Sequence, residues 1–290
     1  MQRVTAFLTA VVLCLTIAGC STNNSPAEIA ATTLPVYEFT SLICEGTGIR
    51  VSRLITEDVS CLHDYSLQVK QMQVIENAEM IVISGAGLED FLNDILTDRK
   101  MVVDASSDIV LHHVECSHDH EEHTHEHDPH IWLSISNAKI MAKNIYTAVS
   151  AKYPQHANTF HTNFVKLNER FDNLISYAEA ELSTLKSRDL ITFHDGFRYM
   201  ADAFDLNILH AITEESGREA SAAELIELIE LVAKNKVSAI FTEKHGSVSA
   251  ASVIAAETGV KTYSLDMAMS GNSYFDAMYY NIKTLKEALQ

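Results

Sequence analysis

The sequence has 290 residues, of which 47% are hydrophobic, and it holds ten glycines and four prolines. This composition is typical of a globular protein with a sizeable core and excludes a largely disordered chain. The formal charge of −18 would repel nucleic acid and anionic lipid head groups while concentrating small cations near the surface, so we expect no nucleic-acid partner.

The first nineteen residues predict an export signal. Arg3 precedes an apolar run over 4–18, which is too short for an ordinary transmembrane helix. The small residues directly before Cys20 resemble the lipobox of bacterial lipoproteins, in which the cysteine is acylated and becomes the mature N-terminus. We therefore expect 1–19 to be removed and 20–27 to form a lipidated Cys20 and a polar tether. An uncleaved anchor, or a plain signal with a chance cysteine, is the alternative.

From residue 28 the pattern predicts strands that alternate with helices. The expected strands cover 29–34, which Pro35 ends, and then 49–55, 80–84 and 101–103. The expected helices cover 36–44, 67–78 and 88–96. Such alternation indicates parallel βαβ units, so 28–153 is predicted to form an N-terminal α/β lobe.

A long helix is predicted after this lobe. A helix over 136–152 is followed by Pro154, which can open a further helix that runs without a breaker to about residue 187. Its apolar residues recur every three or four positions, and at about 1.5 Å per residue it would span some 45–50 Å. We expect 154–187 to be a stiff connector between two lobes.

Residues 188–290 repeat the strand–helix alternation. The expected strands cover 190–193, 207–212, 239–241 and 261–265, and the expected helices cover 196–203, 222–234, 250–258 and 274–289. The predicted fold class is therefore α/β, with two lobes, each a mainly parallel four-stranded sheet flanked by helices, joined by one long connecting helix.

A histidine-rich tract lies near the middle of the chain. Residues 112–130 read HHVECSHDHEEHTHEHDPH and hold eight of the fourteen histidines. The tract has no apolar periodicity, so it predicts a solvated loop that gathers metal ions, rather than a chance polar linker or an expression tag. The candidate auxiliary ligands are His112, His113, His118, His120, His123, His125 and His127.

Four polar residues at the ends of predicted elements are candidates for a tighter metal site. His63 follows the second strand, His130 closes the tract, and His194 and Asp266 end two strands of the second lobe. Open parallel sheets present ligands at the carboxyl ends of their strands, and three imidazoles with one carboxylate suit a tetrahedral zinc site. Taken alone, each could equally be a loop residue, a core histidine or a helix cap.

The cysteines have separate expectations. Cys44 and Cys61 are the natural candidates for a disulfide, because bridges persist in an exported protein. Cys116, inside the histidine-rich tract, could be a soft zinc ligand or a free thiol.

Five short segments carry a resemblance to a known family. Their order and spacing resemble those of the zinc/manganese solute-binding lipoproteins of ABC importers, over nearly all of the chain from about residue 28. The segments read CLHDY (61–65), SGAGLE (84–89), DPHIWL (128–133), TFHD (192–195) and FTE (241–243). The resemblance implies two α/β lobes with a metal ion held between them, and its ligands fall on His63, His130, His194 and, in some members, Asp266.

The resemblance favours zinc over manganese. Manganese-type members carry a glutamate where this chain has His194, and an imidazole suits zinc better than a hard carboxylate does. The chain departs from the family at Cys61-Leu62, which replaces the usual Asp-Pro before the first histidine. A bridge from Cys61 to Cys44 could stiffen that loop instead. Glu243 could orient a ligand imidazole or merely cap the following helix.

We expect an extracytoplasmic, monomeric binding protein that captures Zn²⁺ and delivers it to the transmembrane subunit of an ABC permease. The lipid on Cys20 would anchor it to the outer face of the cell membrane. A manganese-binding member of the same family is one alternative, and a surface metal buffer or adhesin is another. A zinc hydrolase is a third, although the chain holds no His-Glu-x-x-His segment.

Overall fold

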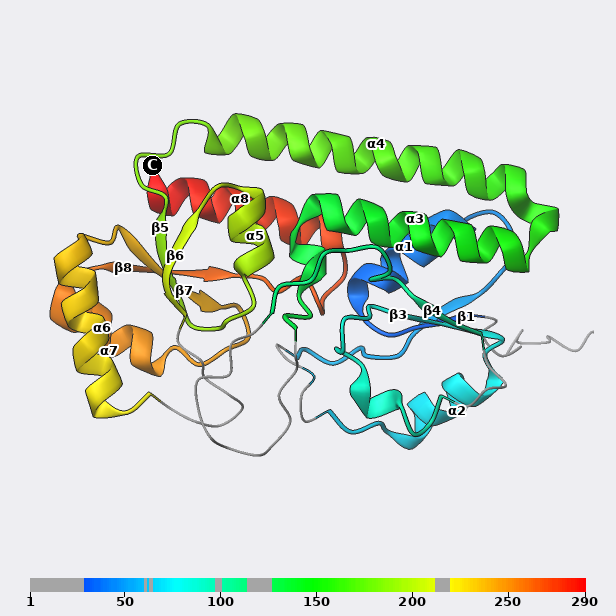
Figure 1. Ribbon diagram of the computed structural model, residues 1–290, viewed down its shortest axis with the longest axis horizontal. Helices are drawn as coiled ribbons and strands as arrows, with labels where there is room; N and C mark the ends of the chain where they lie inside the picture. Colours follow the sequence, from blue (N-terminus) through cyan, green and yellow to red (C-terminus); the bar gives the residue numbers. More distant parts are fainter. Residues whose placement is uncertain (1–28, 60–61, 63–64, 97–100, 114–126, 212–219) are drawn as a thin grey trace, which may run out of the picture.

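A computed structural model describes residues 29–59, 62, 65–96, 101–113, 127–211 and 220–290. They form two four-stranded parallel sheets that lie side by side (Figure 1), which confirms the predicted fold class. The first has the order β2-β1-β3-β4, with β1 (Ile29–Ala31), β2 (Val51–Arg53), β3 (Met80–Ile83) and β4 (Met101–Asp104). The second has the order β6-β5-β7-β8, with β5 (Asp189–Thr192), β6 (Asn207–Ala211), β7 (Ala239–Glu243) and β8 (Lys261–Leu265).

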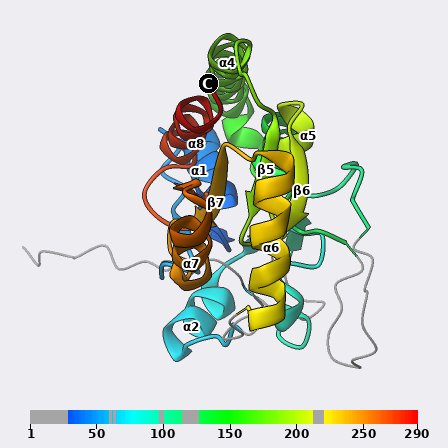
Figure 2. The same ribbon diagram turned by 90° about the vertical axis from the view of Figure 1, so that its left-hand side faces the viewer.

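Helices cover the sheets in two groups. One group runs along the same side of both lobes (Figure 1) and comprises α1 (Leu34–Cys44), α3 (Ile135–Lys152), α4 (Ala157–Leu182) and α8 (Tyr274–Leu289). Figure 2 shows α4 and α8 at the top of the molecule, with α1 below them. The other group comprises α2 (Val69–Asn77), α6 (Ala222–Asn235) and α7 (Ser249–Thr258). The short helix α5 (Arg198–Ala203) follows β5.

The long helix α4 spans both lobes because one stripe of its surface is apolar. Its buried residues, among them Phe160, Leu167, Phe171 and Leu174, recur at helical spacing. That stripe packs on α1 and α3 in the first lobe and on α8 in the second. The connection between the lobes is thus a layer of helices rather than α4 alone.

Several hydrogen bonds tie the lobes together directly, and Trp132 takes part in two of them. The indole Nε1 of Trp132 donates to the carbonyl oxygen of Met267 at 2.7 Å, and the hydroxyl of Tyr274 donates to the carbonyl oxygen of Trp132 at 2.9 Å. All three residues are buried in one apolar core that includes residues of both sheets. A second, smaller core, with Leu228 and Ile254 among its residues, packs α6 and α7 against the second sheet.

Two predicted elements differ markedly from the structure, and the long helix expected over 154–187 is α-helical over Ala157–Leu182. The strand expected over 29–34 ends at Ala31, and Pro35 lies in the first turn of α1, where its missing N–H has no helical partner to lose. The helix expected over 88–96 is replaced by turns and a short 3₁₀ helix, Asp90–Leu92. The reason is local, because the Glu89 carboxylate folds back onto the backbone N–H groups of Ser84 and Gly85.

Several sequence expectations concern residues outside the described ranges. They include the export signal, Cys20, Cys61 and Cys116. Cys44 lies in α1 and is buried, and its bridge to Cys61 stays a prediction. Within the part of the chain that the structure describes, no helix is long and apolar enough to cross a membrane.

Glu89 is a buried acid in the loop that follows β3. Burial raises the pKa of Glu89 to about 7, and the nearby Asp104 adds to this. Hydrogen bonds from the Thr32 hydroxyl at 2.5 Å and from the N–H groups of Ser84 at 2.7 Å and Gly85 at 2.9 Å favour the ionised form but do not cancel the effect of burial. The folded protein therefore binds a proton here more tightly than the unfolded chain does.

This raised pKa predicts a pH-dependent free energy of unfolding. The proton on Glu89 stabilises the folded state fully below about pH 4.5, where the glutamate of the unfolded chain titrates. This stabilisation, up to about 3 kcal/mol, is lost as the pH rises to about 7. Urea unfolding of metal-free protein at pH 5 and pH 8 measures it. We expect Glu89→Gln to lose clearly less stability than the wild type over this interval. Equal losses would contradict the assignment.

Candidate metal centre

Two of the predicted ligands, His130 and His194, meet between the lobes. His130 directly precedes the 3₁₀ helix Ile131–Leu133, and His194 lies two residues after β5. Their Nε2 atoms are 3.3 Å apart, and the rings are perpendicular with centroids 5.0 Å apart. The side chains are 3% and 15% exposed, so bulk water has little access to the pair.

Each imidazole has a carboxylate next to its Nδ1 atom, on the side of the ring away from the other histidine. Asp128 Oδ1 lies 2.8 Å from His130 Nδ1 and also accepts the backbone N–H of His130 at 2.9 Å. Glu243, the last residue of β7, places Oε1 3.1 Å from His194 Nδ1. Both carboxylates are buried. A histidine bound to metal usually donates its other ring N–H to such a carboxylate, which fixes the tautomer.

The carboxylate of Asp128 is suited to this role. Burial alone would raise its pKa, but the hydrogen bonds and positive charge of His130 outweigh burial and hold the pKa of Asp128 below its usual range. An ionised carboxylate can only accept hydrogen bonds, so His130 Nδ1 must carry the hydrogen. The lone pair of the neutral His130 ring is then on Nε2.

His194 has a corresponding neighbour, because its Nδ1 lies 3.1 Å from Glu243 Oε1. When both rings are neutral and carry their hydrogen on Nδ1, the two Nε2 lone pairs face the same space. A metal ion or a shared proton can then bind between them. Two nitrogens that bind one zinc ion at about 2.0–2.1 Å and a tetrahedral angle lie about 3.3–3.4 Å apart, which matches the observed separation.

Asp266 lies at the end of β8 but has a different partner. Its Oδ2 is 3.1 Å from Lys244 Nζ, and its Oδ1 accepts the backbone N–H of Ala268 at 2.8 Å. The Asn281 side chain accepts a hydrogen bond from the backbone N–H of Asp266 and donates one to its carbonyl oxygen, each at 2.7 Å. Among the described residues, no group of three or more His, Cys, Asp or Glu side chains is arranged to hold a metal ion, so Asp266 does not join the two imidazoles in this geometry.

The remaining predicted ligands are only partly described. His63 lies outside the described ranges, as do His118, His120, His123 and His125. Three histidines at the neck of the tract are described. His113 and His127 form an antiparallel bridge with their rings 4.4 Å apart, whereas His112 is paired with Asp202.

Gly196 makes room for the His194 ring. A Cβ atom at this position would lie 2.5 Å from His194 Cδ2, 2.8 Å from His194 Nε2 and 2.8 Å from Met267 Cε. Sequence reasoning singled out neither this glycine nor the carboxylate of Asp128. Each lies two residues from a candidate histidine, and Asp128 also opens the DPHIWL segment that carries the family resemblance.

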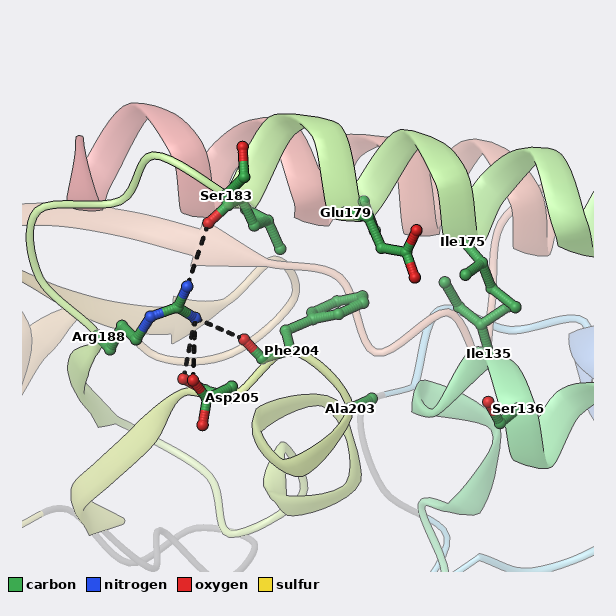
Figure 3. A pocket seen from close by; sticks show the side chains of 11 residues that line it. Ile135, Ser136, Ile175, Glu179, Ser183, Arg188, Ala203, Phe204 and Asp205 are labelled. Atoms are coloured by element: carbon green, nitrogen blue, oxygen red, sulfur yellow. Dashed lines mark hydrogen bonds and ion pairs between the residues drawn. The ribbon is translucent and has the colours of Figure 1, made fainter.

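A separate cavity lies near the helical layer (Figure 3). Its volume is about 390 Å³, and its walls include Ile135 of α3, Ile175 of α4 and Phe204 after α5. At one end the Arg188 guanidinium donates to the carbonyl oxygens of Phe204 and Asp205. None of the proposed ligand residues lines this cavity, so the geometry does not connect it with metal binding.

The carboxylate behind His194 leads to a prediction about zinc affinity. Without Glu243, His194 would lose the group that fixes its tautomer and ring orientation, so Glu243→Ala is expected to weaken zinc binding by about 10–100-fold. A competition titration with a chelator of known affinity measures the change. Glu227→Ala, an exposed substitution on α6, serves as the control. An unchanged dissociation constant for Glu243→Ala would show that Glu243 does not support the ligand.

Comparisons with known proteins agree with this geometry. Residues 29–288 match the family described as "Zinc-uptake complex component A periplasmic". The chain is 32% identical over 311 residues to the zinc-binding lipoprotein AdcA of Streptococcus pneumoniae (strain ATCC BAA-255 / R6), an alignment that covers 99% of this chain and 61% of AdcA. The chain thus spans about three-fifths of the length of this relative. It is also 30% identical over 284 residues to a Treponema pallidum (strain Nichols) protein whose name describes it as metal-binding, with coverage of 92% and 88%.

Solved structures show the same architecture. The Zn(II)-bound ZnuA-like domain of Streptococcus pneumoniae AdcA superposes with a TM-score of 0.76 at 30% identity and covers 91% of this chain and 99% of that domain. A crystal structure of ZnuA gives a TM-score of 0.78 at 23% identity, which supports the likeness of fold.

Proposed function

Because the chain belongs to the family described as zinc-uptake complex component A, periplasmic, we propose that it captures zinc outside the cytoplasm and delivers it to an ABC-type membrane permease. It acts as a binding protein and not as an enzyme. The zinc ion is its cargo, and the transmembrane subunit of the permease is its partner. The name of the AdcA relative, a zinc-binding lipoprotein, supports this role.

One observation carries the proposal. The Nε2 atoms of His130 and His194 converge at 3.3 Å, and both Nδ1 atoms face carboxylates. This arrangement presents two lone pairs at the spacing of two ligands on one tetrahedral zinc ion.

We propose His63 as the third ligand, on the resemblance of its segment to the family pattern. The fourth position is taken by Asp266 or by water. In the described geometry Asp266 is paired with Lys244, so it can coordinate zinc only if this ion pair is exchanged for the metal. Two imidazoles from this pair, with a third from His63, favour zinc over manganese, which prefers oxygen ligands.

The histidine-rich tract would serve a different purpose. Its histidines would bind zinc weakly and exchangeably and so raise the local zinc concentration near the tight site. His112 is engaged with α5, so we assign this auxiliary role to His113, His127 and the histidines between them. A lipid on Cys20 would keep a monomeric protein at the outer face of the membrane, close to the permease.

The pH dependence of zinc binding tests the proposal. Imidazoles bind metal only when neutral, and here a proton competes with zinc for the same space between two Nε2 atoms. Affinity should be high at pH 7.5 and lower by at least about tenfold at pH 5, below the pKa of about 6.5 of a free histidine. Titration of metal-free protein at both pH values, with manganese as competitor, measures this. Equal affinity at both pH values, or displacement of zinc by equimolar manganese, would refute the proposal.

A further inference from the structure

The hydroxyl of Tyr199 joins the neck of the histidine-rich tract to the metal centre. Tyr199 lies on α5 and is buried. Its hydroxyl accepts the backbone N–H of His112 at 3.0 Å and donates to the carbonyl oxygen of Asp128 at 3.1 Å. The backbone N–H of Asp128 donates in turn to the carbonyl oxygen of His112 at 2.9 Å. One hydroxyl thus closes a ring of three hydrogen bonds.

Helix α5 holds this neck through further contacts. The His112 ring packs on the Tyr199 ring with centroids 4.5 Å apart, and His112 Nε2 lies 2.9 Å from Asp202 Oδ2. Arg198 donates to the carbonyl oxygen of His113 at 3.4 Å. Tyr199, Asp202 and Arg198 are all on α5, so the tract that enters the centre from the first lobe is fastened to a helix of the second lobe.

These contacts between the neck of the tract and α5 fix the position of one ligand imidazole relative to the other. Asp128 is held at both ends, because its carboxylate binds His130 while its carbonyl oxygen binds Tyr199. Helix α5 begins four residues after His194, so it moves with the second imidazole. Tyr199 therefore connects the residue behind one ligand with the helix that follows the other.

We infer that Tyr199 is a positioning residue of the metal centre, which sets the spacing between His130 and His194 by tying Asp128 to α5. The inference rests on the proposed function, since it concerns the same zinc site. Without the hydroxyl, the carbonyl oxygen of Asp128 and the N–H of His112 would lose their shared partner. His130 could then shift relative to His194.

The test is Tyr199→Phe, which removes the hydroxyl and keeps the ring that packs on His112. We expect the zinc dissociation constant at pH 7.5 to rise by about tenfold, in the range found when supporting groups of metal ligands are removed. The metal-free melting temperature should fall by only a few degrees, because the two backbone groups lose their partner, while the increase in melting temperature on adding zinc should shrink. Tyr146→Phe is the matched control, because its hydroxyl makes only an exposed 3.5 Å contact with His161.

The outcomes separate this inference from the proposed function. If the wild type binds no zinc tightly, the proposed function fails. If the wild type binds tightly and Tyr199→Phe binds equally well, only the positioning role is overturned. Should Tyr199→Phe not fold, Asp202→Ala is measured instead; its 59% exposed carboxylate holds the other end of His112. About a threefold weakening is expected there, and unchanged affinity would overturn the inference.

Discussion

Gly196→Ala is expected to weaken zinc binding by at least about 100-fold while leaving the fold intact. The new methyl group would lie 2.5–2.8 Å from the His194 ring and 2.8 Å from Met267 Cε, well inside van der Waals contact. Both neighbours are side-chain ends that can move, so the strain is relieved by turning the imidazole away from His130. His194 Nε2 would then no longer point at the zinc position, and His194 Nδ1 would lose its contact with the Glu243 carboxylate.

Chelator competition and thermal unfolding, measured on the same preparation, check this expectation. Gly271→Ala is the control, because its φ of +89° makes alanine strained while no atom lies within 4 Å of the added methyl group. It should cost some stability and leave zinc affinity unchanged. Wild-type zinc affinity in Gly196→Ala would mean that the position of His194 does not determine binding.

Gly85→Ala is expected to destabilise the protein by at least about 3 kcal/mol. A Cβ atom at Gly85 would lie 1.8 Å from Asp104 Oδ1 and 2.5 Å from Ser106 Oγ. Asp104 Oδ1 accepts hydrogen bonds from the N–H and hydroxyl of Ser106, at 2.8 Å and 2.6 Å, and these would be broken. The φ of +85° adds backbone strain of about 1–2 kcal/mol.

Urea unfolding of metal-free protein measures the loss. Gly259→Ala is the matched control, since its φ of +72° carries similar backbone strain with no atom within 4 Å of the new methyl group. It should cost only about 1–2 kcal/mol. A loss for Gly85→Ala no larger than that for Gly259→Ala would show that the contact with Asp104 is not rigid.

Elements with strong local patterns were predictable from the sequence. The apolar stripe of α4 predicts a long helix, and short apolar runs closed by glycine predict strands such as β3. Prediction failed at a helix end, and where a side chain binds the backbone and overrides the local sequence pattern. Pro35 suits the first turn of a helix as well as the end of a strand, and the Glu89 carboxylate bends 84–89 into a loop that no helical spacing can reveal.

The sequence predicts candidate ligands and one supporting group, Glu243, but not the other groups that position these residues. His194 is found by its position after a strand, His130 by its place at the end of the histidine-rich tract, and both by the family resemblance. The ion pair of Asp266 with Lys244 depends on side-chain geometry, which the position of Asp266 after a strand does not determine. The same holds for the hydroxyl of Tyr199, whose two partners belong to the other lobe.

Zinc binding here depends on one feature, the meeting of the Nε2 atoms of two imidazoles in a space that little water reaches. Anomalous diffraction at the zinc edge, from a crystal of protein loaded with one equivalent of zinc, tests it most directly. The account predicts one strong peak about 2.0–2.1 Å from the Nε2 atoms of both His130 and His194. A peak confined to the histidine-rich tract, with these two nitrogens uncoordinated, would contradict it.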